Sequence, residues 1–84
     1  MALEVYPNPA NYMTTVRYSV ESGEEVGIGI YNIVGKKLLD IDAGIRPPGY
    51  HTEHVDMANL VPGIYIVALR TGARTAYAKL VVWR

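Results

Sequence analysis

The chain has 84 residues, no cysteine, and eight basic residues that balance eight acidic ones. This length fits a single domain, and the lack of cysteine excludes disulfides, thiolate zinc sites and cysteine nucleophiles. The balanced charge offers no cluster of Lys and Arg for nucleic acid, and the longest apolar stretch, residues 63–69, is too short to span a membrane. Half of the residues are apolar, with many β-branched and tyrosine side chains that favour strands. We therefore expect an all-β domain that neither binds nucleic acid nor inserts into a membrane.

Turns rich in Pro, Gly and Asn divide the chain into runs of strand length. Two of these runs alternate apolar and polar residues, as strands with one dry and one wet face do, and the run from Ile64 to Leu69 is apolar enough for burial on both faces. The seven predicted strands are Leu3–Tyr6, Thr14–Val20, Val26–Tyr31, Lys37–Ala43, His51–Asp56, Ile64–Leu69 and Thr75–Val82. They predict an immunoglobulin-like sandwich of about seven antiparallel strands in two sheets, with residues 1–84 as one domain. In the third strand, Gly27 and Gly29 leave room for a neighbouring group on the face opposite the core.

Two prolines end the first strand, since neither can donate to a strand ladder. Proline fixes its own φ and restricts the residue before it. The motif Pro7, Asn8 and Pro9 therefore predicts a rigid lead into the second strand, with Asn8 able to hydrogen-bond nearby backbone.

Two glycines and two tyrosines are expected to maintain the fold. Gly35 and Gly63 follow turn residues, where glycine adopts backbone angles that other residues avoid. Tyr31 and Tyr65 can bury their rings while each hydroxyl reaches a partner at the edge of a sheet.

The last strand carries Lys79, Leu80, Val81 and Val82, a basic residue followed by three apolar ones. A strand at the edge of a sheet offers unpaired backbone to a partner, so this segment could form a docking surface. It could equally be an ordinary closing strand with Lys79 in solvent, and the residues alone leave both readings open. The same open edge would allow pairing with a second copy of the chain, giving a homodimer.

The histidines and acidic residues give no metal site. His51 and His54 are three apart on a strand and point to opposite faces. His51 shares a face with Glu53, and Asp40 shares one with Asp42, but calcium takes six or more oxygen ligands and no loop supplies them. We predict exposed, solvated side chains here, with no metal or cofactor.

No arrangement of residues predicts catalysis. Ser19 and Ser22 are the two serines, and neither lies in a nucleophile elbow. A glycine-rich phosphate loop would require a helix that the sequence does not predict. We therefore expect that the domain is not an enzyme.

Four segments, in order along nearly the whole chain, resemble the signatures of C-terminal sorting domains of the type IX (Por) secretion system. The first is the proline motif, and the second is a strand that runs into a Gly-basic turn. The third carries Gly49 and a Pro-Gly-Ile-Tyr strand, and the fourth is a basic residue followed by apolar ones. They are Tyr6-Pro7-Asn8-Pro9-Ala10-Asn11, Ile30-Tyr31-Asn32-Ile33-Val34-Gly35-Lys36, Gly49-Tyr50-His51 with Asp56 and Leu60-Val61-Pro62-Gly63-Ile64-Tyr65, and Ala78-Lys79-Leu80-Val81-Val82.

This resemblance implies a domain excised from the C-terminus of a larger secreted protein. It implies recognition by outer-membrane secretion machinery and its processing peptidase, with passage through the periplasm and an end at the cell surface or beyond. Lys79 to Val82 are the residues expected to be recognised, with the proline motif in support. The chain departs from the family pattern at Glu53, where an apolar residue is usual, and in its bulky ending Trp83-Arg84.

Two alternatives stay open. The Ile-Tyr-x-x-x-Gly turn and the Pro-Gly-x-Tyr strand also resemble the immunoglobulin-like domain of flagellar hook-capping proteins. The domain could instead be a structural or carbohydrate-binding accessory sandwich, because aromatic rings in a row on one sheet face stack on sugars. The aromatic candidates for such a row are Tyr12, Tyr50, Tyr77 and Trp83.

Overall fold

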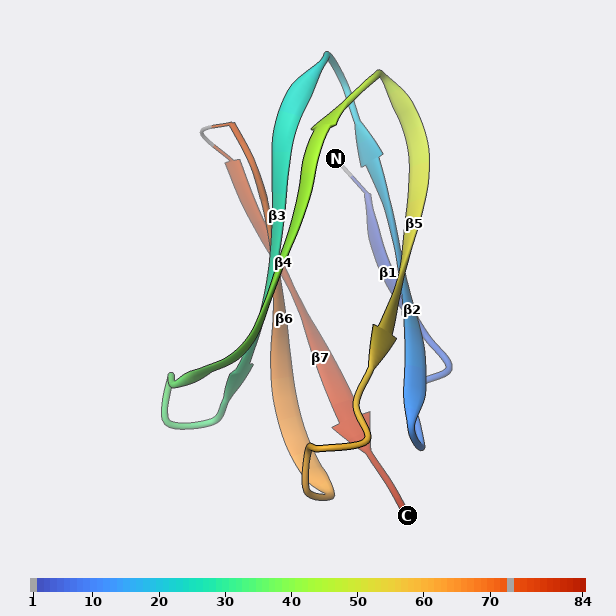
Figure 1. The fold of residues 1–84 in the computed structure, drawn as a ribbon, viewed down its shortest axis with the longest axis vertical. Coiled ribbons are helices and arrows are strands. Elements are labelled where there is room, and N and C mark those ends of the chain that lie inside the picture. The colour runs from blue at the N-terminus through green and yellow to red at the C-terminus, as the bar shows by residue number, and fades with distance from the viewer. Residues whose placement is uncertain (1, 73) are drawn as a thin grey trace.

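The computed structural model describes residues 2–72 and 74–84, and it confirms the predicted all-β sandwich (Figure 1). The described residues form strands and connecting loops without a helix. The strands are β1 (Leu3–Tyr6), β2 (Met13–Val20), β3 (Glu24–Asn32), β4 (Lys37–Arg46), β5 (Gly49–Asp56), β6 (Gly63–Thr71) and β7 (Arg74–Val82).

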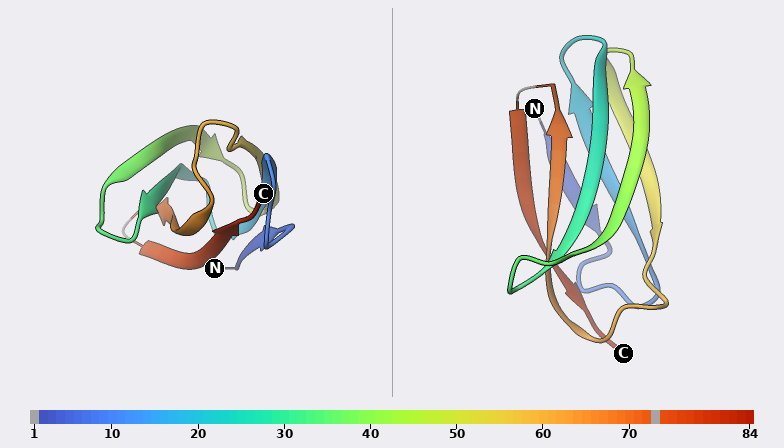
Figure 2. Two further views of the ribbon diagram at one scale, coloured as in Figure 1. Left: turned by 90° about the horizontal axis from the view of Figure 1, so that it is seen from below. Right: turned by 60° about the vertical axis from the view of Figure 1, so that its left-hand side comes forward.

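The strands form two antiparallel sheets that pack face to face (Figure 2). One sheet has the order β1-β2-β5 and the other the order β4-β3-β6-β7. The chain changes sheet between β4 and β5 through Pro47 and Pro48. β1 begins toward one end of the long axis, and β7 ends at the other (Figure 1).

The core lies between the sheets and follows the predicted alternation. Each apolar side chain on the inward face of β2 and β3 is at most 4% exposed, and burying such a side chain contributes roughly 1.5–3 kcal/mol. These inward residues are Val16, Tyr18, Val20, Val26, Ile28 and Ile30. In β6, which lies between β3 and β7, burial on both faces was predicted from Ile64 to Leu69 and is confirmed for Val67, Ala68 and Leu69. It is wrong for Ile64, which is 48% exposed.

The two glycines of β3 are covered by side chains, as predicted. A Cβ atom on Gly27 would lie 3.1 Å from the Arg70 guanidinium, and one on Gly29 would lie 2.8 Å from the Tyr31 ring. Both side chains therefore cover these glycines on the outer face of the four-stranded sheet.

A side chain and a glycine hold the turn between β3 and β4 together. The Asn32 Oδ1 atom accepts hydrogen bonds from the backbone N–H groups of Val34 (3.1 Å) and Lys36 (2.9 Å). Gly35 has a φ of 87°, which confirms the backbone angle predicted for it. Gly49 has a φ of 123° where β5 begins, so glycine fits that position as well.

Tyr65 closes the loop before β6. Its ring is buried and its hydroxyl donates to the Val61 carbonyl, four residues upstream. This contact is the tyrosine corner of immunoglobulin-like sandwiches and confirms the role predicted for Tyr65. The same prediction is wrong for Tyr31, because its side chain is only partly buried and its hydroxyl makes no hydrogen bond within residues 2–72 and 74–84. Gly63, between Val61 and Tyr65, has a φ of 159° at the border of the extended region.

Candidate functional site

Strand β7 is an edge strand of the four-stranded sheet, as predicted, and its side chains alternate between core and surface. Leu80 and Val82 are 0% and 2% exposed and belong to the core. Lys79 is exposed and Val81 is partly exposed on the outer face. Of the four residues predicted for recognition, two therefore have side chains on the outer surface and two hold β7 on the sandwich.

The proline motif covers the C-terminal half of the β7 edge. The Asn8 Nδ2 atom donates to the Lys79 carbonyl (2.8 Å), and the Val81 N–H donates to Asn8 Oδ1 (2.9 Å). The side-chain amide thus takes the place of a neighbouring strand's backbone. Ala10 continues this pairing, because its N–H donates to the Val81 carbonyl and its carbonyl accepts from the Trp83 N–H, both at 2.8 Å.

Two predictions about this region need correction. Asn8 was expected to bond nearby backbone, but its partners lie more than 70 residues downstream. One of the two readings left open for β7 had its edge unpaired, but Asn8 and Ala10 cover that edge from Lys79 onward. A second copy of the chain could not pair with this covered half without displacing them.

Replacing Asn8 with alanine is expected to uncover this edge. The loss of two exposed hydrogen bonds should cost about 1 kcal/mol of unfolding free energy. It should also speed exchange of the Val81 amide hydrogen by roughly tenfold, because that N–H loses its acceptor. Hydrogen exchange followed by NMR measures this rate.

Asn8→Asp is the matched control, since a carboxylate keeps the acceptor for Val81 and loses the donor for Lys79. Protection of the Val81 amide should therefore survive in Asn8→Asp. Equal exchange in the native protein and in Asn8→Ala would show that Asn8 does not close the edge.

The last residue closes the same end of the sandwich. The Arg84 guanidinium donates to the Leu60 and Met57 carbonyls and lies 4.5 Å from the centre of the Tyr12 ring. The bulky ending noted in the sequence therefore holds the loop before β6, while Trp83 is exposed.

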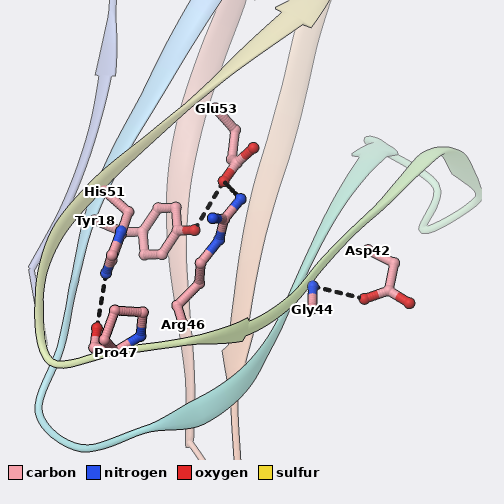
Figure 3. A network of polar contacts seen from close by, with 7 residues as sticks. All are labelled: Tyr18, Asp42, Gly44, Arg46, Pro47, His51 and Glu53. Atoms are coloured by element: carbon pink, nitrogen blue, oxygen red, sulfur yellow. Dashed lines mark hydrogen bonds and ion pairs between the residues drawn. The ribbon is translucent and has the colours of Figure 1, made fainter.

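A second polar cluster lies where the chain changes sheet (Figure 3). The Glu53 Oε2 atom accepts from the Tyr18 hydroxyl (2.9 Å) and from the Arg46 guanidinium (3.2 Å). Glu53 was predicted to be exposed and solvated, which is wrong, because only 18% of its side chain is exposed. It lies on the inward face of β5, where Arg46 balances its charge and the neutral Tyr18 hydroxyl donates a hydrogen bond to it.

Two causes raise the pKa of Tyr18 to about 12: burial, which is the larger, and the hydrogen bond to Glu53. His51, on the same face, donates from Nε2 to the Pro47 carbonyl (2.7 Å), and its ring centroid is 5.7 Å from that of Tyr18. These contacts join β2, β4 and β5, so the cluster ties the two sheets together. The Arg46 Nε atom is buried without a hydrogen-bond partner among the described residues.

The other predicted pairs are also engaged in local contacts. His54 faces away from His51, as predicted, and its Nδ1 lies 3.1 Å from the Thr15 hydroxyl. Asp42 accepts from the Gly44 N–H (2.9 Å; Figure 3), and Asp40 lies 3.5 Å from Lys37. Residues 2–72 and 74–84 hold no group of three or more His, Cys, Asp or Glu that could bind a metal ion.

Residues 4–83 match the family described as the secretion system C-terminal sorting domain. The chain belongs to this family. The match confirms the type IX resemblance inferred from the four segments and identifies the domain as a sorting signal of a secreted protein. A comparison with curated proteins finds no match.

The sorting domain carries its four candidate aromatic residues in three separate places. Tyr12 and Trp83 lie at the C-terminal end of the sandwich, Tyr50 lies on β5 with Arg17 4.1 Å from its ring centre, and Tyr77 lies on β7. All are exposed, but they do not form one row. In the part of the sorting domain that the structure describes, no helix has the length and apolar character to cross a membrane.

Proposed function

We propose that residues 1–84 form the folded C-terminal export signal of a larger cargo protein. In this proposal the domain reaches the periplasm joined to its cargo and is recognised there by the type IX machinery of the outer membrane. The processing peptidase of that machinery then removes the domain, and the cargo ends on the cell surface or outside the cell. The membership of residues 4–83 in the sorting-domain family carries this proposal.

We further propose that the machinery recognises the segment from Lys79 to Val82. The exposed Lys79 ammonium and the partly exposed Val81 side chain would make the contacts, while buried Leu80 and Val82 fix their direction. Pro7, Asn8 and Pro9 support this surface, because Asn8 ties the backbone of Lys79 and Val81 in place. The domain itself performs no chemistry in this role.

An export assay with a charge reversal tests the proposal. A periplasm-directed fluorescent reporter is fused ahead of residue 1 in a bacterium that has the type IX system, and the culture medium is assayed for fluorescence. Lys79→Glu should lower export by about tenfold, because it replaces an attraction at the proposed contact with repulsion. Lys36→Glu, a charge reversal at another exposed lysine in the turn between β3 and β4, should leave export unchanged.

Point substitutions are preferable to truncation, because deletion of residues 79–84 would also remove Leu80 and Val82 from the core. Equal export of the two variants would place recognition elsewhere on the sandwich. Retention of the native fusion in the periplasm with the domain folded would refute the sorting role itself.

A further inference from the structure

The outer face of the four-stranded sheet is hollowed beside the turn between β3 and β4. The hollow has a volume of about 460 Å³ and crosses β6 from that turn to β7. Ile66 and Ala68 of β6 form its floor, and Tyr31 and Tyr77 line it from the strands on either side. Tyr31 takes this position because Gly29 has no side chain beneath its ring. We call this hollow the tyrosine groove.

Asn32 lines the tyrosine groove and is occupied by the turn, but four other polar side chains of the groove make no hydrogen bond to the described residues. Arg70 lies at the groove, and its guanidinium makes no hydrogen bond or ion pair with any residue in 2–72 or 74–84. The Tyr31, Tyr77 and Thr75 hydroxyls likewise make no hydrogen bond within those ranges. Three acidic residues, Glu25, Asp40 and Asp42, line a second hollow on the other side of Arg70, so an anion would approach the guanidinium from the groove side.

These features favour a sugar over a peptide. β6 pairs with β3 on one side and β7 on the other, so the floor has no free backbone for the strand pairing that extended peptides use. Ligand sites combine apolar and aromatic walls with a few polar groups. A pyranose ring supplies both an apolar face for the tyrosine rings and hydroxyls for the polar groups. An unpaired guanidinium adds a preference for a carboxylate, which it binds through two parallel hydrogen bonds.

We propose that the tyrosine groove binds an oligosaccharide that carries carboxylates, as uronic acid residues do. This binding is independent of export. Tyr77 and Tyr31 stack on the sugar rings, and Arg70 pairs with one carboxylate.

The opposite sheet provides a natural comparison. Arg17 and Tyr50 line a hollow of similar size there, together with Arg46. In that hollow the cations already have partners, because Arg17 lies 2.9 Å from Glu4 and over the Tyr50 ring, and Arg46 pairs with Glu53. Arg17 and Tyr50 are therefore matched controls for Arg70 and Tyr77.

NMR titration of the ¹⁵N-labelled domain with hexagalacturonate tests the inference. Saturable shifts are expected at the amides of Tyr31, Ala68 and Tyr77. Tyr77→Ala should weaken binding by about tenfold or more through loss of ring contact. Arg70→Gln should weaken it by about tenfold, the size of one charge-assisted contact. Neutral cellohexaose should bind the native domain about tenfold more weakly for the same reason.

Tyr50→Ala and Arg17→Gln should bind hexagalacturonate with native affinity, and a dispersed spectrum shows that each variant is folded. The proposal is overturned if no amide of the groove shifts saturably, or if the two control variants weaken binding as much as the groove variants do. It is also overturned if cellohexaose binds as tightly as hexagalacturonate. Hexaglutamate shifting the same amides with equal affinity would show an anionic peptide site instead. Because the titration uses no secretion machinery, failure here leaves the sorting role untouched.

Discussion

Replacing Leu80 with alanine is expected to lower the free energy of unfolding by about 3 kcal/mol. Leu80 is fully buried in the core between the sheets, and its truncation leaves a cavity that the surrounding strands can only partly fill. A domain of this size has a stability on the order of 5–15 kcal/mol, so the loss is a large share of the total. Urea denaturation measures it as a lower midpoint with an unchanged slope.

Lys79→Ala is the neighbouring control. This side chain is exposed on the outer face, so its removal should change stability by no more than about 0.5 kcal/mol. If the two variants were equally stable, Leu80 would not be part of the core, and the division of β7 into core and surface residues would fail. If the division holds, an export defect in Leu80→Ala reflects folding, whereas one in Lys79→Glu reflects recognition.

The strands were predictable because apolar and polar residues alternate along them, and the apolar residues mark the buried face. Val16, Tyr18 and Val20 alternate with polar residues in β2, and burial confirms each of them. The end of β4 was not predictable. That strand continues three residues past Ala43 to Arg46, because the pairing with β3 shifts register near Gly44, where φ is positive, and the shift interrupts the alternation.

The contacts that define the candidate site lay beyond sequence reasoning because they join distant segments. Asn8 and Lys79 are 71 residues apart, and only the closing of the sandwich brings the first and last motifs together. Glu53 stood out as a charge on an apolar face, but its partners come from β2 and from the end of β4. An arginine directly before Pro47-Pro48 was the one available signal for such a partner.

The tyrosine groove was missed for a related reason. Tyr77 was among the aromatic candidates, whereas Tyr31 was assigned only to the fold. Whether two aromatic residues share a face of a sheet depends on strand order and register. Here Tyr31 pairs with Ile66 across β3 and β6, and Tyr77 pairs with Ala68 across β6 and β7, which places both rings on the outer face.

The domain is expected to lose about 2–3 kcal/mol of unfolding free energy at high pH through Tyr18 alone. Burial and the hydrogen bond to Glu53 favour the neutral hydroxyl, which raises the pKa of Tyr18 from 10.0 in the unfolded chain to about 12 in the folded one. A raised pKa contributes stability that is complete below the unfolded value. Between the two values the unfolded chain binds fewer protons, so stability falls as the pH rises from 10.0 to about 12.

Tyr18→Phe isolates this contribution, because the phenylalanine ring fills the same space and does not titrate. At neutral pH the variant should be about 1 kcal/mol less stable, since Glu53 loses one donor. As the pH rises above 10.0, the denaturation midpoint of Tyr18→Phe should fall less steeply than that of the native protein. The two plots of stability against pH should therefore converge or cross. Parallel curves would refute the raised pKa. In Glu53→Gln the pKa should fall only part of the way, because burial, the larger cause, persists.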